Sequence, residues 1–221
     1  MNKINDYYNA GPEPQSPSIS LILEGRMYRV RRGNIQMKIN DRDYYHRNLR
    51  YTIRSAVEND AGPLSELRLE IDGETENLDR EQGEAYINEE GFKDLIRGDT
   101  ESLNHLFLIA EIDREIVGYS RCECDHLKRF SHKVEFGVGV LRAFWGNGIG
   151  RSLLKESIIW SDSNDIRKMT LRVLETNKKA ISLYKEYGFE VEGTLKEDRW
   201  LSDGIYYNTL LMARLNPDRT M

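Results

Sequence analysis

The chain has 221 residues, of which 39% are hydrophobic and 31% charged, and its formal net charge is −5 at pH 7. This predicts one main hydrophobic core, and the sequence has neither an apolar run of about 18 residues, as a membrane-spanning helix needs, nor a secretory signal. Cys122 and Cys124 are too close for an ordinary disulfide within one strand, and four scattered histidines complete no metal set, so we expect free thiols, no metal and a cytoplasmic location.

The first 48 residues differ from the rest of the chain. Residues 1–18 are rich in proline and glycine and poor in apolar residues, which predicts a disordered leader. Residues 19–48 alternate apolar and polar residues around two glycine-containing turns, which predicts a small β-rich extension. Its arginines make it basic, which allows a contact with RNA or the ribosome, but we expect a solvated strand face. An extension of the main sheet and a dimer contact stay open.

Residues 49–216 have the pattern of a domain that mixes helices and strands. The predicted elements are, in order, a strand from Tyr51, two helices, a hairpin across Asp113-Arg114, a strand ending at Val140, a helix from Arg151, a strand over 169–174, a helix ending before Gly188, and a final hairpin with a type I′ turn at Asp203-Gly204. We find no internal repeat.

The centre of the chain is a glycine-rich turn, Phe144-Trp-Gly-Asn-Gly-Ile-Gly-Arg151, between a predicted strand and a predicted helix. The first N–H groups of a helix lack acceptors and glycines allow close backbone approach, so this arrangement predicts an anion site. A nucleotide P-loop does not fit, because its leading glycine would fall on Trp145 and its lysine on Arg151. The dinucleotide fingerprint is one residue longer. On this motif alone, a purely structural turn stays open.

A second motif follows about thirty residues later. Asn177 is placed to begin a helix as its N-cap, and Gly188 to end it, with Phe189 next. The run Trp-Gly-Asn-Gly-Ile-Gly and the later run Asn-x-x-Ala-Ile-x-Leu-Tyr-x-x-x-Gly-Phe together resemble the GNAT superfamily of acyl-CoA-dependent N-acetyltransferases. The resemblance covers roughly residues 51–215. It implies an α/β (α+β) fold with a mixed, mostly antiparallel central sheet and helices on both faces.

The resemblance also implies that acetyl-CoA is the co-substrate. The cofactor-binding residues that it implies are Val138 and Val140 beside the pantetheine arm, the backbone of Gly146, Asn147, Gly148, Ile149, Gly150 and Arg151 around the pyrophosphate, and Asn177. One position departs from the family pattern. Trp145 replaces the usual Arg or Gln, so no side-chain contact to the cofactor is carried over there.

Two catalytic residues follow from the same resemblance. Tyr184 would protonate the leaving thiolate, for which a phenol with an ordinary pKa near 10 is suited. Glu135 would take the proton of the amine, often through water. The alternatives are a core tyrosine and a glutamate paired with a nearby lysine. His132 and Tyr206 or Tyr207 are reserve candidates for the base, and a reaction that needs no base stays open.

Residues 58–90 contain twelve Asp and Glu against two Arg, a local net charge of −10. The resemblance places this stretch on one wall of the acceptor cleft, where carboxylates would attract a cationic amine. We therefore expect a small acceptor such as a polyamine or aminoglycoside, or a peptide N-terminus. A solvated helix face is an equal alternative.

Two other functions stay open at this point. One is a catalytically silent acyl-CoA sensor or scaffold, against which Asn177 and Tyr184 argue. The other is a ribosomal-protein acetyltransferase that uses the basic extension. Residues 49–221 carry 24 Lys and Arg against 32 Asp and Glu, a net charge of −8 that disfavours nucleic-acid binding. No membrane partner is expected, and a homodimer stays open.

Overall fold

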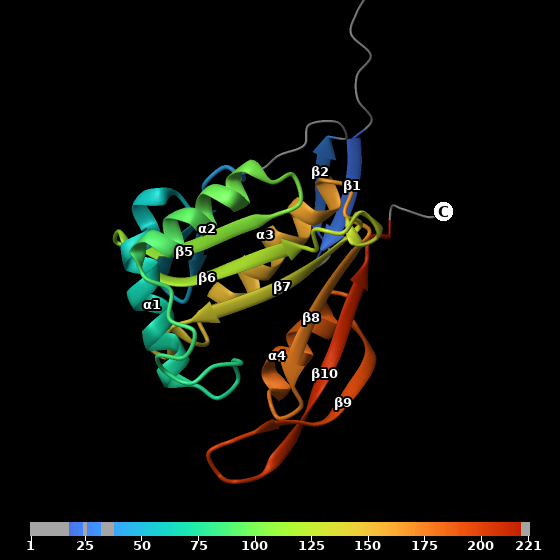
Figure 1. Ribbon diagram of the computed structural model, residues 1–221. Helices are drawn as coiled ribbons and strands as arrows, with labels where there is room; N and C mark the ends of the chain where they lie inside the picture. Colours follow the sequence, from blue (N-terminus) through green and yellow to red (C-terminus); the bar gives the residue numbers. More distant parts are fainter. Residues whose placement is uncertain (1–17, 24–25, 32–37, 218–221) are drawn as a thin grey trace, which may run out of the picture. The chain divides into compact units, whose positions relative to one another are not determined.

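The computed structural model describes residues 18–23, 26–31 and 38–217 (Figure 1). The chain divides into two compact units, Met1–Asn34 and Ile35–Met221. In the first unit, β1 (Ser18–Leu23) and β2 (Arg26–Arg31) pair as an antiparallel hairpin. The predicted leader lies outside the described residues except for Ser18, and the predicted extension over 19–48 spans parts of both units.

The second unit is built on an eight-stranded sheet with the order β3-β4-β5-β6-β7-β8-β10-β9. Its strands are β3 (Arg42–His46), β4 (Leu49–Ser55), β5 (Leu106–Ile112), β6 (Glu115–Cys124), β7 (Lys133–Val140), β8 (Lys168–Leu174), β9 (Glu190–Trp200) and β10 (Tyr206–Leu215). All neighbouring pairs are antiparallel except β7–β8, which is parallel. The predicted mixed, mostly antiparallel sheet is confirmed.

Helices cover both faces of this sheet. They are α1 (Ala61–Glu74), α2 (Glu89–Glu101), α3 (Ile149–Ser163) and α4 (Lys178–Glu186), with short 3-10 turns at Glu58–Asp60, Lys128–Phe130 and Arg142–Phe144. Adjacent residues of β6 identify the faces, because neighbouring strand residues point to opposite sides. The Arg121 guanidinium binds the Asp99 carboxylate of α2, whereas the Ser120 hydroxyl oxygen lies 3.3 Å from the Ser157 hydroxyl oxygen of α3. None of the helices in the described ranges is long and apolar enough to cross a membrane.

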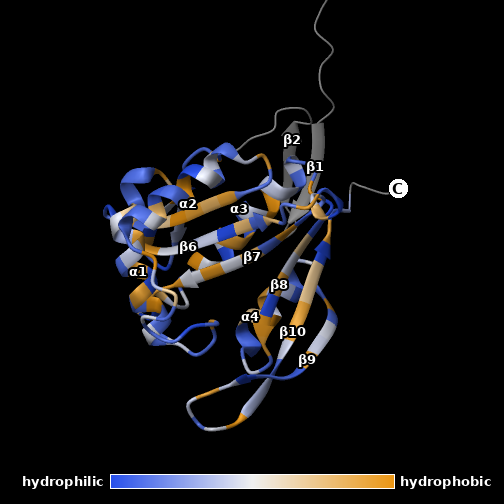
Figure 2. Cartoon of the chain, viewed as in Figure 1, coloured by the Kyte–Doolittle hydropathy of each residue, from blue (hydrophilic) through white to orange (hydrophobic). Residues whose placement is uncertain are grey.

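The core lies between the sheet and these helices. On the α1/α2 face, Leu64 and Ile71 of α1 pack with Phe92 of α2 and with Phe107 and Ile109 of β5, all of them buried. Figure 2 shows β5 and β10 mainly in hydrophobic colours, whereas the outward turns of α1 and α2 are mainly hydrophilic. The sheet therefore supplies much of the apolar surface that the helices cover.

Local signals begin and end several of these elements as predicted. Asn177 begins α4 by accepting a hydrogen bond from the Ala180 N–H (3.2 Å), and Gly188 follows the helix with a φ of 84°. The turn between β5 and β6 has left-handed backbone at Asp113 and Arg114, as a two-residue hairpin requires. The predicted type I′ turn between β9 and β10 is wrong. Only its glycine has a positive φ, and the loop there spans 201–205.

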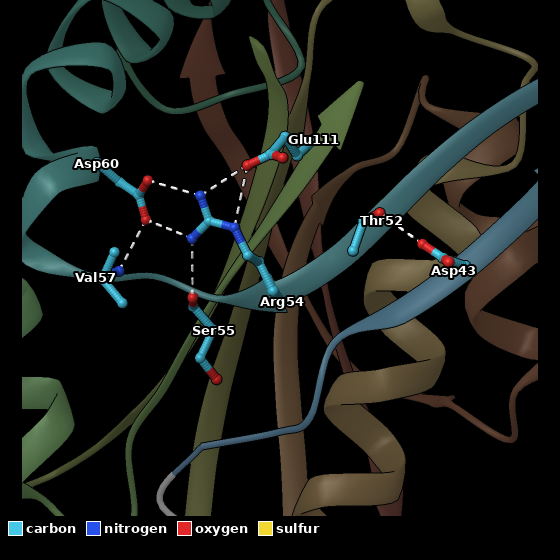
Figure 3. A network of polar contacts seen from close by, with 7 residues as sticks. All are labelled: Asp43, Thr52, Arg54, Ser55, Val57, Asp60 and Glu111. Atoms are coloured by element: carbon cyan, nitrogen blue, oxygen red, sulfur yellow. Dashed lines mark hydrogen bonds and ion pairs between the residues drawn. The ribbon is translucent and has the colours of Figure 1, made fainter. Parts of the chain in front are cut away.

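A network of polar contacts fixes the start of α1 to the sheet (Figure 3). The Arg54 guanidinium of β4 makes two hydrogen bonds to Asp60 (both 2.8 Å) and two to Glu111 of β5. The same Asp60 carboxylate accepts the Val57 N–H (2.8 Å). These charge-assisted bonds therefore set where α1 leaves the sheet.

The neighbouring strands β7 and β8 diverge. Their parallel pairing covers only residues 133–135 of β7 and 168–170 of β8. Beyond these residues both strands continue without pairing to each other, and Figure 1 shows them separating, with α4 beside the opening. The sheet is thus interrupted at its centre, where the middle strand would otherwise bind a neighbour on both sides.

Candidate active site

A cleft of ≈ 1230 Å³ opens where β7 and β8 diverge. Its walls are the backbone of β7 from Glu135 to Val140, the glycine turn before α3, and the start of α4. On the α1/α2 side it continues between the sheet and the segment that joins these two helices. Among the described residues, no group of three His, Cys, Asp or Glu could hold a metal ion.

The backbone groups of β7 alternate in direction. The Leu141 N–H, just past the strand, donates to a carbonyl of β6 (3.0 Å). The carbonyls of Val134 and Val140 point the other way, since they accept bonds from the Thr170 hydroxyl (3.2 Å) and the Trp145 indole (2.7 Å). Alternate residues of a strand share a direction. The backbone N–H and C=O groups of the residues between Val134 and Val140 therefore point alternately toward β6 and toward the opening.

By this alternation, the N–H and C=O of Val138 face the opening. β8 has already diverged there, so these groups can pair with an extended ligand, as at a sheet edge. At Val140 the carbonyl is already taken by Trp145. The Trp145 side chain is 47% exposed and lies under the Arg142 guanidinium, 5.6 Å from its ring centre. In this structure the Trp145 side chain therefore contacts the end of the strand.

The glycine turn brings the N-terminus of α3 to the cleft. Gly146 and Gly148 have φ values of 81° and 78°, a left-handed conformation that glycine adopts without strain. The Ser152 N–H is the first to bond within the helix, to the Gly148 carbonyl (2.9 Å). The amides of the residues from Gly148 to Arg151 thus have no acceptor within α3. They give the cleft a positive end that suits a phosphate.

Two further predicted cofactor residues have partners within the protein. Asn147 donates from its side chain to the Phe144 carbonyl (3.2 Å), which holds the turn closed. The Arg151 guanidinium is bonded to the Glu186 carboxylate of α4 (2.9 Å). These two side chains therefore stabilise the turn, and Asn147 does not line the cleft.

Tyr184 lies in the cleft on the α4 side. The residue is 7% exposed. Its ring packs edge-on against Phe136 of β7, with 6.5 Å between the ring centres, and at a tilt against Phe189, with 5.8 Å between the ring centres. Burial raises the pKa of Tyr184 to about 12. Tyr184 is thus packed as a core tyrosine, which is the alternative left open by the sequence, and it also lines the cleft. A neutral phenol here can donate a proton but is a poor base.

Glu135 is exposed and lines the same cleft from β7, on the opposite face of the strand from Phe136. It lies directly across from Glu123 of β6, whose carboxylate pairs with Arg121 (2.6 Å). Arg121 also binds α2, so this row of side chains is on the α1/α2 face. Tyr184 and Glu135 therefore reach the cleft from opposite faces of the sheet.

The prediction that residues 58–90 line the cleft with carboxylates is wrong. Of those twelve acids, only Asp79 lines it within the described residues. Others are engaged in the fold, such as Asp60 with Arg54 and Asp72 with Arg80. The local charge is thus partly offset by arginine partners and is not directed into the cleft.

Arginines line the α1/α2 side of the cleft instead. They are Arg68, Arg80, Arg121, Arg172 and Arg199. In the sequence the first two stand out only as charges in an acidic stretch, and no motif marks Tyr119, which lies beside them. A signal for Arg68 was present, because it follows Leu64 by four residues and precedes Ile71 by three, so the helical period places it on the buried face.

The segment between α1 and α2 also contacts the β9–β10 hairpin. Arg199 donates to the carbonyls of Asn77 (3.3 Å) and Leu78 (3.2 Å). The Ser202 N–H donates to the Glu76 carboxylate (2.8 Å). These contacts join the two chain segments that border the α1/α2 side of the cleft.

The diverging strands, the exposed strand backbone and the glycine turn at a helix N-terminus define the fold class of acyl-CoA-dependent acyltransferases. The chain belongs to the acetyltransferase (GNAT) family, whose model matches residues 71–189, and it is thus a GNAT-family acetyltransferase. Members of this family use acetyl-CoA.

Individual proteins agree with this assignment. The chain is 35% identical over 109 residues to the L-amino acid N-acetyltransferase AaaT of Escherichia coli, and the matched region covers 49% of this chain and 67% of that protein. It is 33% identical over 107 residues to an N-alpha-acetyltransferase of Sulfolobus acidocaldarius, covering 44% and 62%. Among solved structures, a GNAT acetyltransferase from Streptococcus pneumoniae matches with a TM-score of 0.72 at 26% identity, covering 75% of this chain and 99% of that one. The chain thus spans about two thirds of the length of these curated relatives.

Proposed function

We propose that the protein transfers the acetyl group of acetyl-CoA to the primary amine of a small-molecule acceptor. One observation carries the proposal: Tyr184 and Glu135 line a single cleft from opposite faces of the sheet. A thioester between the diverging strands would then have a proton donor on its sulfur side and a carboxylate on its amine side.

Each proton transfer of the reaction has a residue that can perform it. The amine nitrogen bonds to the acetyl carbon, the carbon–sulfur bond breaks, Tyr184 gives its proton to the sulfur, and Glu135 accepts the proton of the amine through water. The Val138 N–H is directed into the opening and would stabilise the negative oxygen that develops on the carbonyl. The Tyr184 phenolate that remains would regain its proton from solvent.

Binding of acetyl-CoA follows from the same geometry. The amides of residues 148–151 would hold the pyrophosphate, and the free backbone of Val138 would pair with the pantetheine arm. The Asn177 amide, which lines the cleft, would bond the cofactor through the N–H groups that capping leaves available. These roles rest on the orientation of these groups and on the family.

The test is release of free CoA thiol from acetyl-CoA against L-amino acids, polyamines, aminoglycosides and short peptides, with Tyr184→Phe alongside. Tyr45→Phe, which removes an exposed hydroxyl outside the cleft, is the matched control. We expect turnover on one class of amine, a fall of about 100- to 10,000-fold in kcat for Tyr184→Phe, and no change for the control.

Other outcomes identify the alternatives. Tight acetyl-CoA binding without turnover on any amine would point to a sensor or scaffold, and turnover on peptides alone would point to a protein N-terminus. The names of the relatives include both amino-acid and N-alpha acetyltransferases, so both classes belong in the panel. Both cysteines are free, which supports the proposal of a reducing, cytoplasmic location.

A further inference from the structure

Arg68 of α1 is buried in the wall of the cleft without sufficient partners. The residue is 9% exposed and lines the α1/α2 side of the cleft. Its Nη1 atom is buried and has no hydrogen-bond partner among the described residues. A guanidinium has five N–H donors and stays charged, so leaving one buried donor unbonded is costly.

The nearest carboxylate does not neutralise this group. Asp72 is bonded to Arg80 through both oxygens (3.0 and 3.2 Å), whereas the closest approach of Arg68 to it is 3.6 Å, beyond ordinary hydrogen-bond length. Two guanidiniums therefore share one carboxylate, a net charge of +1 in a largely buried place. Burial, and then the repulsion of Arg80, lower the pKa of Arg68 from its usual value.

A neighbouring arginine of the same wall shows the contrast. Arg121 binds the Asp99 carboxylate through two nitrogens and Glu123 through a third. That cluster is fully paired, whereas Arg68 and Arg80 share one carboxylate.

We infer that Arg68 and Arg80 bind a carboxylate of the acceptor, so that the acceptor is a small amine with a carboxylate in the same molecule, such as a free α-amino acid. A bidentate guanidinium–carboxylate bond would satisfy the buried donor and balance the charge of the cluster. A polyamine or aminoglycoside would instead bring further positive charge to a cationic wall. The inference deepens the proposed function and rests on it.

The position of the cluster fits this role. Tyr119 of β6, beside the two arginines, lies opposite Gly139, which is on the same face of β7 as Glu135. Gly139 and Glu135 are four residues apart, which is about 13 Å of strand, a distance that long side chains such as those of Arg68 and Glu135 can shorten. The intervening Gly137 leaves open space above the strand.

Around the cluster the wall is apolar. Phe92, Leu95 and Phe107 line the same side of the cleft. An amino acid with an apolar side chain would thus bury that side chain here while its carboxylate meets the arginines.

The experiment compares L-phenylalanine with L-phenylalaninamide and phenethylamine, which keep the amine and ring but lack the carboxylate. For the unmodified protein we expect kcat/KM to be about 10- to 100-fold higher with L-phenylalanine. Arg68→Met, which keeps much of the side-chain length, and Arg80→Gln should each remove this preference by raising KM for L-phenylalanine, with kcat/KM for phenylalaninamide unchanged within threefold.

Controls separate the possible failures. Arg97→Gln removes an exposed arginine that is paired with Glu58 outside the cleft, and should leave the preference intact. Thermal unfolding and acetyl-CoA affinity establish that each variant is folded, and Arg80→Gln, on a partly exposed residue, serves if Arg68→Met does not fold. Turnover of all three amines at equal rates, or a preference that persists in both variants, would overturn this inference and leave the proposed function standing. No turnover on any amine would contradict the proposed function.

Discussion

Replacing Gly148 by alanine tests whether the left-handed glycine turn holds the N-terminus of α3 open to a phosphate. Gly148 is the N-cap of α3, and its φ of 78° is a conformation that an L-residue adopts only with strain. An added Cβ would lie 3.5 Å from the Tyr51 hydroxyl and 3.6 Å from His46, which are ordinary contacts. The perturbation is therefore almost entirely one of backbone conformation.

The expected magnitudes follow from that conformation. A non-glycine residue in the left-handed region costs about 1–2 kcal/mol, which for a domain of this size lowers Tm by about 2–8 °C. Relief of the strain would rotate the amides of Gly148 and Ile149 away from the cleft. Loss of one hydrogen bond to a charged phosphate costs about 1.5–3 kcal/mol, so we expect acetyl-CoA to bind about 10- to 150-fold more weakly.

The assay pairs calorimetric titration of acetyl-CoA with thermal unfolding, and the matched control is Gly204→Ala. Gly204 has the same φ of 78°, an added Cβ would meet nothing within 4 Å, and the residue lies outside the cleft. The control should lose the same stability and keep its acetyl-CoA affinity. Equal acetyl-CoA affinity in Gly148→Ala and in the unmodified protein would refute the reasoning, as would equal weakening in both variants.

Three further predictions concern Gly137 and Tyr184 in the cleft and His105 outside it. Gly137→Ala should keep or slightly raise thermal stability, because the added Cβ meets nothing within 4 Å, yet raise KM for the acceptor; unchanged kinetics would show that the acceptor lies elsewhere. Because burial raises the pKa of Tyr184 to about 12, kcat should show no loss due to this group up to pH 10, and a fall near pH 9 that Tyr184→Phe abolishes would contradict the raised pKa. The hydrogen bond to Asp99 raises the pKa of His105 above its usual 6.5, so this stabilisation is complete below pH 6.5 and is lost as pH rises through the folded-state pKa. Urea unfolding should record that decline, and His105→Gln should flatten it.

Much of the fold follows from local sequence signals. The cap at Asn177, the left-handed glycine after α4 and the turn at Asp113-Arg114 each depend on a few adjacent residues. Because those residues determine their own backbone conformation, the pattern predicts the element and its ends. The loop between β9 and β10 is the exception, since contacts of Ser202 with the α1–α2 segment compete with the preference of Asp203-Gly204 for a tight turn.

The α1/α2 side of the cleft could not be predicted in the same way. Asp60 is neutralised by Arg54 from a strand, and Asp72 by Arg80 from the segment after its own helix. Charge along the sequence therefore said little about charge in the cleft, because pairing is decided by tertiary structure. A buried arginine on the apolar face of α1 was the one readable sign of a cationic wall.

The contacts between the α1–α2 segment and the β9–β10 hairpin have a consequence for protein engineering. Arg199 and Ser202 hold backbone and side-chain groups of residues 76–78, so the two borders of the α1/α2 side of the cleft depend on each other. A change of acceptor specificity is therefore best made by transplanting both segments together from another member of the family. Exchanging either segment alone would replace one partner of these bonds, whereas the joint graft would keep both partners together and leave the glycine turn unchanged.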